Sequence, residues 1–214
     1  MINKDDNTEK RILAAARQEF YEKGFAGARM EEIARAAEIN KAMLHYYFRS
    51  KQKLFEKVFH EAFAQIFPRL IQIILSEVPL DEKIRKISST YNELLTENPH
   101  LPLFVLSSIQ RNPENFATGM ITDNPFQPSM VMGKFITEIQ AAVDAGKISP
   151  IDPRDLILNL LAMSVFPFMM KPILVRLFGM SESDYLAFVQ HRKNSVAEFA
   201  IRAVFSPDTK SSEL

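Results

Sequence analysis

The chain of 214 residues contains no cysteine and only 6 glycines. Without cysteine it forms no disulfide bond and binds no metal through thiolates, which is compatible with a reducing cytosol. It also has no glycine-rich phosphate loop, dinucleotide-binding fingerprint, nucleophile elbow or histidine pair with metal-ligand spacing. We therefore expect no catalytic residue, no metal site and no cofactor, and the protein is predicted not to be an enzyme.

Targeting and membrane-spanning segments are also missing from the sequence. Residues 1–10 are polar and charged, so they do not form a signal peptide. The most apolar run, residues 156–170, is interrupted by Asn159 and Pro167 and is shorter than the roughly 20 residues that a membrane helix needs. The sequence therefore predicts a soluble, cytoplasmic protein with no membrane partner.

The net charge is zero, but the charges are unevenly placed. Residues 1–60 hold 12 Lys or Arg against 9 Asp or Glu, and the remainder holds 14 against 17. This asymmetry alone does not indicate nucleic-acid binding. Residues 41–53, however, contain no acid and carry five basic side chains: Lys41, His45, Arg49, Lys51 and Lys53.

The segment from Met30 to Phe48 has the pattern of two short helices joined by a tight turn. The first helix has apolar residues at the i, i+3, i+4, i+7 spacing, and the second has an apolar pair at i, i+4. Asn40 stands where an N-cap would satisfy the free N–H groups of the second helix. Two such helices, the second rich in hydrogen-bond donors, fit a helix-turn-helix that inserts its second helix into the major groove of DNA.

These residues resemble the DNA-binding domain of the TetR family of bacterial transcriptional regulators. The resemblance covers roughly residues 6–66, with the helix-turn-helix motif at 29–48. It rests on the following residues: Arg11, Ile12, Leu13, Ala15, Ala16, Phe20, Gly24, Phe25, Ile33, Ala34, Ala36, Ala37, Ile39, Leu44 to Phe48, Ser50, Lys51, Leu54 and Phe55. One position departs from the family pattern, because Glu38 occupies the turn where Gly is preferred. If the backbone there adopts a positive φ, Glu costs about 1 kcal/mol relative to Gly.

The resemblance implies which side chains meet DNA. Lys41, Ala42 and Met43 match the amino-terminal end of the recognition helix, where base edges are contacted, and apolar side chains there suit thymine methyl groups. Arg29 matches a position that contacts either a phosphate or a base, and the remaining predicted contacts match positions that mostly hold phosphates: His45, Tyr46, Tyr47 and Lys51. An alternative for Tyr47, which adjoins Phe48, is a place partly in the core.

Residues 67–206 carry no further motif and are predicted to form a carboxy-terminal helical domain. Helices are expected at 81–97, 101–111, 129–145, 153–178 and 181–205, and the Asn-Pro-rich segment 112–128 is expected to be a mobile loop or lid. The fold class is all-α. It comprises an amino-terminal three-helix helix-turn-helix domain and a carboxy-terminal ligand-binding and dimerisation domain.

The middle of the chain is rich in methionine and phenylalanine, which suit a pocket for varied apolar ligands. The simpler interpretation, helical core, applies to most of these residues taken singly. The resemblance favours a small-molecule pocket. Its candidate residues are Tyr91, Phe104, Gln110, Met132, Phe135, Met163 and Phe166.

The last two helices have more apolar surface than one partner helix covers. Within the last helix, Val196, Phe199 and Ala203 share one face. The alternatives are a monomer core and a homodimer in which two helices from each chain form a four-helix bundle. We favour the dimer, because a single recognition helix reads too few base pairs. The predicted interface residues are Leu160, Phe188, Val196, Phe199 and Ala203.

Together these features predict a DNA-binding transcriptional regulator. It is expected to be a repressor that is released from a palindromic operator in double-stranded DNA by a small apolar or amphipathic effector. The alternative keeps the DNA binding without an effector and gives the carboxy-terminal domain a role in protein–protein interaction. An enzyme on the same fold would need a convergent polar site, which the sequence does not indicate.

Overall fold

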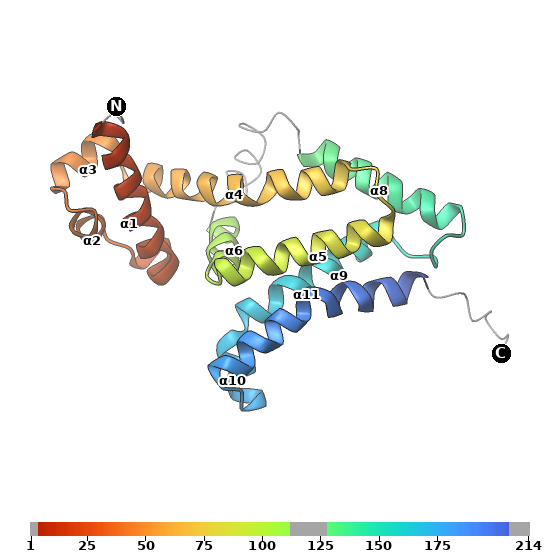
Figure 1. The fold of residues 1–214 in the computed structure, drawn as a ribbon. Coiled ribbons are helices and arrows are strands. Elements are labelled where there is room, and N and C mark those ends of the chain that lie inside the picture. The colour runs from red at the N-terminus through yellow and green to blue at the C-terminus, as the bar shows by residue number, and fades with distance from the viewer. Residues whose placement is uncertain (1–3, 112–127, 206–214) are drawn as a thin grey trace. The chain divides into compact units, whose positions relative to one another are not determined.

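Residues 4–111 and 128–205 are described in the computed structural model. They form α1 (Lys4–Gly27), α2 (Met30–Ala36), α3 (Lys41–Tyr47), α4 (Lys51–Leu75), α5 (Leu80–Glu97), α6 (Leu101–Arg111), α8 (Pro128–Asp144), α9 (Pro153–Met169), α10 (Lys171–Phe178) and α11 (Glu182–Phe205) (Figure 1). Over these ranges the chain contains no strand, and the predicted all-α fold is confirmed. The predicted mobile segment lies, up to residue 127, outside the described residues.

Contacts divide the chain into two compact units. The amino-terminal unit contains the described residues up to Ile66 together with α6, and the carboxy-terminal unit contains Phe67–Pro99 and helices α8 to α11. Helix α4 therefore contributes residues to both units. Residues 101–111 fall in the first unit, although the sequence analysis assigns them to the second domain.

The amino-terminal unit is built around the apolar faces that the helical periodicity predicts. Each of helices α1 to α4 buries its apolar side chains, and the fully buried ones are Ile12, Ala16, Ile33, Leu44, Leu54 and Val58. Helix α6 adds Phe104, whose ring lies 4.9 Å from Tyr21 and 5.1 Å from Phe55 between centroids. Phe104 is thus part of the aromatic core of the amino-terminal unit.

The turn between α2 and α3 has a left-handed backbone conformation at Glu38, the position where the family prefers glycine. Glu38 has φ 55°, and it is the non-glycine residue with a positive φ among those described. Two backbone hydrogen bonds close the turn, from Glu38 N–H to Arg35 O (3.1 Å) and from Ile39 N–H to Ala34 O (3.0 Å). The Glu38 side chain is 84% exposed and lies 3.6 Å from Arg11, a pair that contributes little in water.

Glu38→Gly is therefore expected to stabilise the protein by about 1 kcal/mol, because glycine has no Cβ to strain this conformation. Urea denaturation monitored by circular dichroism measures the change. Ala14→Gly, at an exposed helical position of α1, is the matched control and should destabilise by up to about 1 kcal/mol. A loss of stability in Glu38→Gly would show that the turn carries no such strain.

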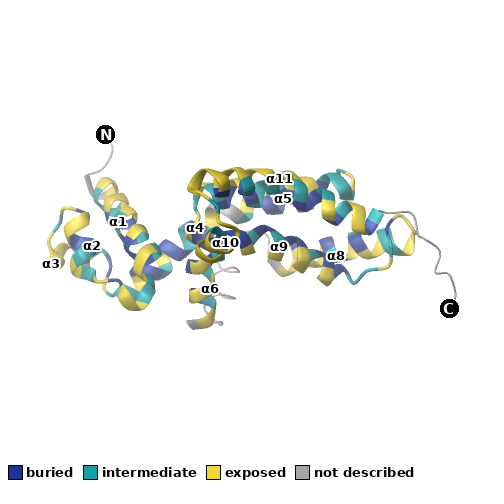
Figure 2. Ribbon diagram, turned by 90° about the horizontal axis from the view of Figure 1, so that it is seen from below, coloured by how far each residue is buried: buried dark blue, intermediate teal, exposed yellow. Residues whose placement is uncertain are grey.

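The carboxy-terminal unit packs α5 against α11 and α9, and α9 against α8 (Figure 2). Small residues of α11, Ala197 and Ala200, are buried together with Val189 and Val196, so that α11 can approach its neighbours closely. Helix α10, all of whose residues are described, has no buried residue.

The single helix predicted at 153–178 is wrong, because α9 and α10 are two helices bent by 75° at Met170. Two prolines flank the break, Pro167 inside α9 and Pro172 in the first turn of α10. Pro167 has no N–H to donate to Met163 O, and the Arg192 guanidinium donates to that carbonyl instead (2.7 Å). The Tyr185 hydroxyl donates to Pro167 O (3.2 Å). Side chains of α11 thus satisfy carbonyl groups that the bend leaves without helical donors.

Two parts of the described chain are long and apolar enough, by length and composition, to cross a membrane. They are α4, and α9 with α10 taken as one bent span. Core helices of soluble proteins pass the same test. Helix α4 buries Leu54 in the first unit and Leu70 in the second, and its Glu61 lies 3.0 Å from Arg17. These features favour a core helix, and the predicted absence of a membrane partner stays a prediction.

Candidate nucleic-acid interface and effector pocket

Helix α3 begins at a defined cap. Asn40 has extended backbone (φ −82°, ψ 160°), and its side-chain oxygen accepts a hydrogen bond from Met43 N–H (2.7 Å). Ser50 has the same role for α4, because its hydroxyl accepts from Lys53 N–H (3.1 Å). The predicted N-cap at Asn40 is confirmed. The two caps fix where the recognition helix starts and where the next helix follows it.

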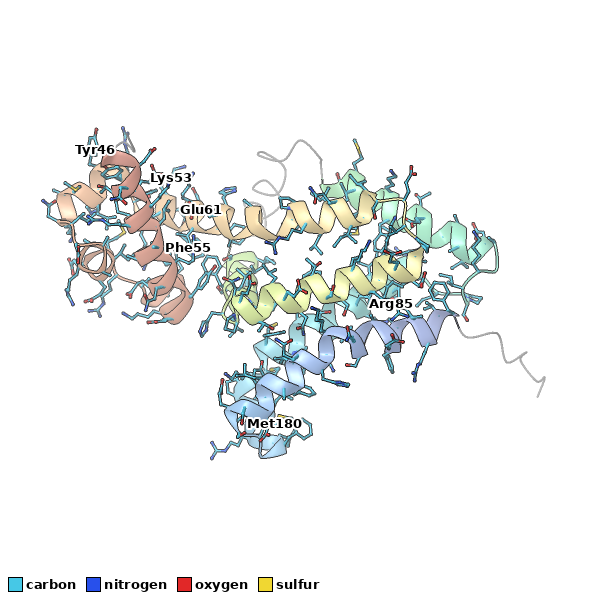
Figure 3. All side chains as sticks on the ribbon, in the orientation of Figure 1. Tyr46, Lys53, Phe55, Glu61, Arg85 and Met180 are labelled. Carbon is cyan, nitrogen blue, oxygen red and sulfur yellow. The ribbon has the colours of Figure 1, made fainter. Side chains whose placement is uncertain are left out.

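One side of α3 is buried and the other is open to solvent. Leu44 is fully buried and anchors the helix, whereas Tyr46 is 82% exposed and Met43 is 42% exposed. Lys41, Ala42 and His45 are also exposed. Figure 3 shows Tyr46 at the outer edge of the amino-terminal unit, away from the core residue Phe55. Long and polar side chains on an outward helix face are what major-groove contact requires.

The sequence predicts that Tyr47 either contacts a phosphate or lies partly in the core. The residue is half-buried, which leaves part of its ring accessible to DNA. Its ring packs edge-on against Tyr46, with centroids 5.6 Å apart. This contact restricts the Tyr46 ring without removing it from solvent.

Three of the basic side chains predicted to contact DNA come from different elements. Lys41 lies 2.6 Å from Glu31 of α2, and its hydrogen bond lowers the pKa of that carboxyl group. Lys51 donates to Ala26 O (3.3 Å) and lies 4.6 Å from the centre of the Phe25 ring. Arg29 is the exposed N-cap of α2. DNA at Lys41 has to compete with Glu31.

Glu19 is a positioning residue that the sequence analysis does not identify. Its side chain is 11% exposed, accepts from Lys23 Nζ (2.8 Å) and accepts from Arg29 N–H (3.2 Å). It therefore joins α1 to the first turn of α2, next to the candidate contact Arg29. The sequence signal for this role is an acid on the side of α1 that packs inward. Its partner, the Arg29 N–H group, is ten residues away and cannot be inferred from local spacing.

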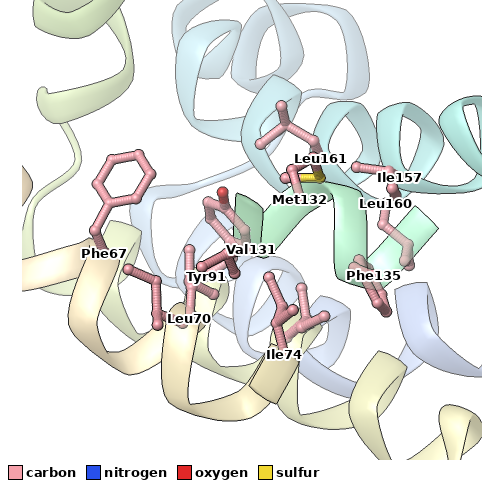
Figure 4. A pocket seen from close by; sticks show the side chains of 12 residues that line it. Phe67, Leu70, Ile74, Tyr91, Val131, Met132, Phe135, Ile157, Leu160 and Leu161 are labelled. Carbon is pink, nitrogen blue, oxygen red and sulfur yellow. The ribbon is translucent and has the colours of Figure 1, made fainter. Parts of the chain in front are cut away.

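The carboxy-terminal unit contains an apolar pocket of about 140 Å³ (Figure 4). Helices α4, α5, α8 and α9 line it with Phe67, Leu70, Ile71, Ile74, Ile87, Tyr91, Val131, Met132, Phe135, Ile157, Leu160 and Leu161. Tyr91 brings a phenol to an otherwise apolar lining, and burial raises its pKa to about 12. The phenol therefore stays neutral at physiological pH and is able to donate a hydrogen bond.

The structure brings together three of the predicted pocket residues, Tyr91, Met132 and Phe135. The other four do not line it. Phe104 lies in the core of the amino-terminal unit, Gln110 is exposed on α6, Met163 is partly buried elsewhere on α9, and Phe166 is 54% exposed. Of the nine lining residues that sequence reasoning missed, four come from α4, whose apolar face continues past Pro68, and the other five come from α5, α8 and α9.

The predicted dimer residues also separate into two sets. Leu160 and Val196 are each 3% exposed within the single chain, so they have no surface to offer a partner, and this part of the prediction is wrong. Leu160 lines the pocket instead. Phe199 is 66% exposed, Ala203 is exposed, and Phe188 is half-buried beneath Arg192. Periodicity identified apolar faces but not which of them α5 covers.

Metal-ligating side chains do not gather in the described ranges, where no group of three or more His, Asp or Glu residues is close enough to hold an ion.

Known proteins resemble the chain in sequence and in fold. Residues 12–58 match the family described as bacterial regulatory proteins, tetR family. The HTH-type transcriptional repressor NicS of Pseudomonas putida is 25% identical over 142 residues, which span 66% of this chain and 64% of NicS.

Two solved structures share the fold. AibR, in complex with isovaleryl coenzyme A and operator DNA, superposes with a TM-score of 0.67 at 16% identity, covering 94% of this chain and 100% of AibR. FadR of Bacillus subtilis, in complex with stearoyl-CoA, superposes with a TM-score of 0.64 at 18% identity, covering 91% of this chain and 98% of FadR. The amino-terminal helix-turn-helix domain therefore belongs to the tetR family of bacterial regulatory proteins, and the chain as a whole shares the fold of these two proteins.

Proposed function

We propose that this protein is a cytoplasmic transcriptional regulator, a repressor that binds a palindromic operator as a homodimer and leaves it when a small effector binds. The observation that carries the proposal is the capped helix α3, anchored by buried Leu44 and presenting exposed Lys41, Met43 and Tyr46. NicS, a repressor by name, supports the assignment through a match that extends past the DNA-binding domain.

Sequence-specific DNA binding tests the proposal directly. Genomic fragments retained by the full-length chain are sequenced, and a duplex carrying the shared site is titrated by fluorescence anisotropy at several salt concentrations. We expect a two-fold symmetric site with half-sites one helical turn, about 34–36 Å, apart. The same duplex with scrambled half-sites is the control. Equal affinity for both duplexes at physiological salt would contradict the proposal.

Dimerisation is proposed through α11 and its neighbours. Phe199 and Ala203 keep their exposed places on one face of α11, and Phe166 and Leu186 on α9 and α11 are 54% and 48% exposed. A contiguous apolar patch is typical of a surface that a partner covers, and we propose that these side chains contribute to one. A second copy is the partner that a symmetric operator requires.

Phe199→Glu is expected to convert the dimer into a monomer, because association would bury an unpaired carboxylate. Sedimentation velocity at micromolar concentration measures the change in mass. Gln72→Glu, which adds the same charge at an exposed position of α4 away from this surface, is the control and should remain dimeric. A wild-type protein that sediments as a monomer would refute this part of the proposal.

The effector is proposed to bind the apolar pocket of the carboxy-terminal unit. Two observations support a ligand over the alternative of a purely protein-binding domain: the pocket has about 140 Å³ of free volume, and its lining is almost wholly apolar. AibR and FadR, which share the fold, were each solved with an acyl coenzyme A. Helix α4 contributes Leu70, Ile71 and Ile74 to this pocket and Leu54 and Val58 to the DNA-binding unit. A ligand that moves α4 would therefore alter the DNA-bound arrangement.

A further inference from the structure

A buried charge pair lies beside the apolar pocket. Lys83 of α5 is only 4% exposed, and its ammonium group donates to Glu138 of α8 (2.5 Å) and to Ile74 O of α4 (2.9 Å). All three residues belong to the carboxy-terminal unit. The pair therefore connects the last turn of α4, which ends at Leu75, to α5 and α8.

The pair does not itself line the pocket but adjoins residues that do. Ile74, whose carbonyl holds Lys83, lines the pocket with its side chain. Ile87 follows Lys83 by four residues on α5, and Phe135 precedes Glu138 by three residues on α8, and both line the pocket. Residues three or four apart share one face of a helix. Lys83 and Glu138 thus lie one turn beyond the apolar lining.

The two side chains differ in whether water can solvate them once the pair is broken. The Glu138 side chain is 32% exposed, so it can rotate into water and remain solvated. Lys83 cannot, because it is buried, and a buried ammonium group without an anion is strongly unfavourable. An ammonium group also has three N–H donors, two of which are used by Glu138 and Ile74. Lys83 is therefore a fixed cation whose anion is replaceable.

We propose that the effector is a small carboxylate with a compact apolar body, and that its carboxylate replaces Glu138 on Lys83. This inference rests on the proposed effector pocket and names the ligand class. The free volume of about 140 Å³ is close to that of engineered apolar cavities, about 150 Å³, that bind benzene, so the apolar body is the size of a phenyl or branched acyl group.

Replacing Glu138 also supplies a route for regulation. Glu138 is the link from α8 to Lys83, while Lys83 keeps its hydrogen bond to the last turn of α4. Once the ligand holds Lys83, α8 loses that link and becomes free to shift relative to α4 and α5. The ligand thus changes the packing around α4 through a charge exchange as well as through its apolar volume.

Benzoate and benzamide are the probes for the test, because they have the same size and differ in charge. Isothermal titration of the full-length protein without DNA gives their dissociation constants. In the wild type we expect benzoate to bind more tightly than benzamide by about fivefold or more. Glu138→Gln removes the competing charge and should tighten benzoate by about tenfold or more while leaving benzamide within about twofold. Glu97→Gln, an exposed position of α5, is the control and should change neither.

Lys83→Met keeps the length of the side chain, removes the cation, and should abolish the preference for benzoate. If that variant does not fold, Glu138→Gln still decides, since an unchanged or weaker affinity for benzoate in that variant overturns the proposal. Tighter binding of benzamide in both the wild type and Glu138→Gln would overturn it as well and assign a neutral ligand. These titrations contain no DNA, so failure of the carboxylate assignment is distinct from failure of operator binding.

Discussion

Replacing Lys41 and Lys51 together with alanine is expected to lower operator affinity by about a hundredfold or more. Each lysine is expected to form a charge-assisted hydrogen bond with the DNA, and a hydrogen bond of a charged group contributes about 1.5–3 kcal/mol, where 1.4 kcal/mol is tenfold. The two residues lie on α3 and at the start of α4, so they contact separate groups of the DNA. Neutralised phosphates release counterions, and the slope of log K against log salt should become shallower by about 2.

The contribution of Lys41 is reduced by its existing partner. Glu31 lies 2.6 Å away in the free protein and must be displaced before Lys41 binds DNA. Because both side chains are more than half exposed, the pair is weak and solvent screens it. We therefore expect Glu31 to reduce the contribution of Lys41 only slightly, and single variants resolve the contributions of the two lysines.

Fluorescence anisotropy titrations between low and physiological salt measure both the affinity and the slope. Lys134→Ala with Lys147→Ala removes the same two charges from exposed positions of the carboxy-terminal unit and controls for net charge. Met43→Ala is a contrasting variant, expected to change the preferred sequence while leaving the salt slope unchanged. Wild-type affinity in the Lys41/Lys51 double variant would refute the proposed interface.

Local features of the DNA-binding unit could be predicted from the sequence. Asn40 caps α3 because its side-chain oxygen accepts a hydrogen bond from an N–H group only three residues further along the chain. A contact over so few residues can be predicted from the local sequence. The family's preference for glycine at the turn points to position 38 as a candidate for a positive φ, and Glu38 has one. Such predictions depend on neighbours in sequence, and here those neighbours are also the neighbours in space.

Packing between distant elements could not be predicted in the same way. Phe104 belongs to an apolar helix, but only the fold decides that it packs on Tyr21 and Phe55 of the other domain. Leu160 and Val196 have the periodicity of an interface, yet helices of the same chain cover them. An apolar stripe shows that a face is buried and does not show what buries it.

Neither the break at Met170 nor the Lys83–Glu138 pair could be predicted from the sequence, because each depends on a residue far away along the chain. Pro167 in a strongly apolar run is compatible with a kinked or a broken helix, and the outcome depends on Arg192, 25 positions further along, which supplies the missing donor. Lys83 and Glu138 are 55 residues apart, and nothing in either segment indicates that a lysine near the start of α5 is buried. Sequence reasoning therefore identified an apolar pocket and left out the charge pair beside it.

Filling the pocket is expected to abolish the response to effector while leaving operator binding intact. Val131 of α8 is 4% exposed and lines the pocket, so Val131→Phe places a ring in the free volume of about 140 Å³. An effector typically changes the affinity of a protein for its second ligand by about 5–150-fold. In Val131→Phe we expect the effector to change operator affinity by less than about twofold. A misfit of the ring costs about 1–3 kcal/mol, which would lower the melting temperature by several degrees without unfolding the protein.

The effector for this experiment is the strongest hit from a thermal-shift screen that contains both small carboxylates and neutral apolar compounds. Operator affinity is titrated with and without it, and sedimentation confirms the oligomeric state of each variant. Ala141→Phe adds the same ring at an exposed position of α8 and should respond like the wild type.

The variant separates two explanations of an effector response. A ligand lowers operator affinity only through its different affinity for the DNA-bound and free states, so it must reach a site that changes between them. If Val131→Phe no longer binds the compound and no longer responds, that site is the pocket beneath Leu70 and Ile74 of α4. If the variant no longer binds the compound in the pocket yet still releases DNA when the compound is added, the response arises at another site. The protein-interaction alternative then becomes the better account of the carboxy-terminal unit.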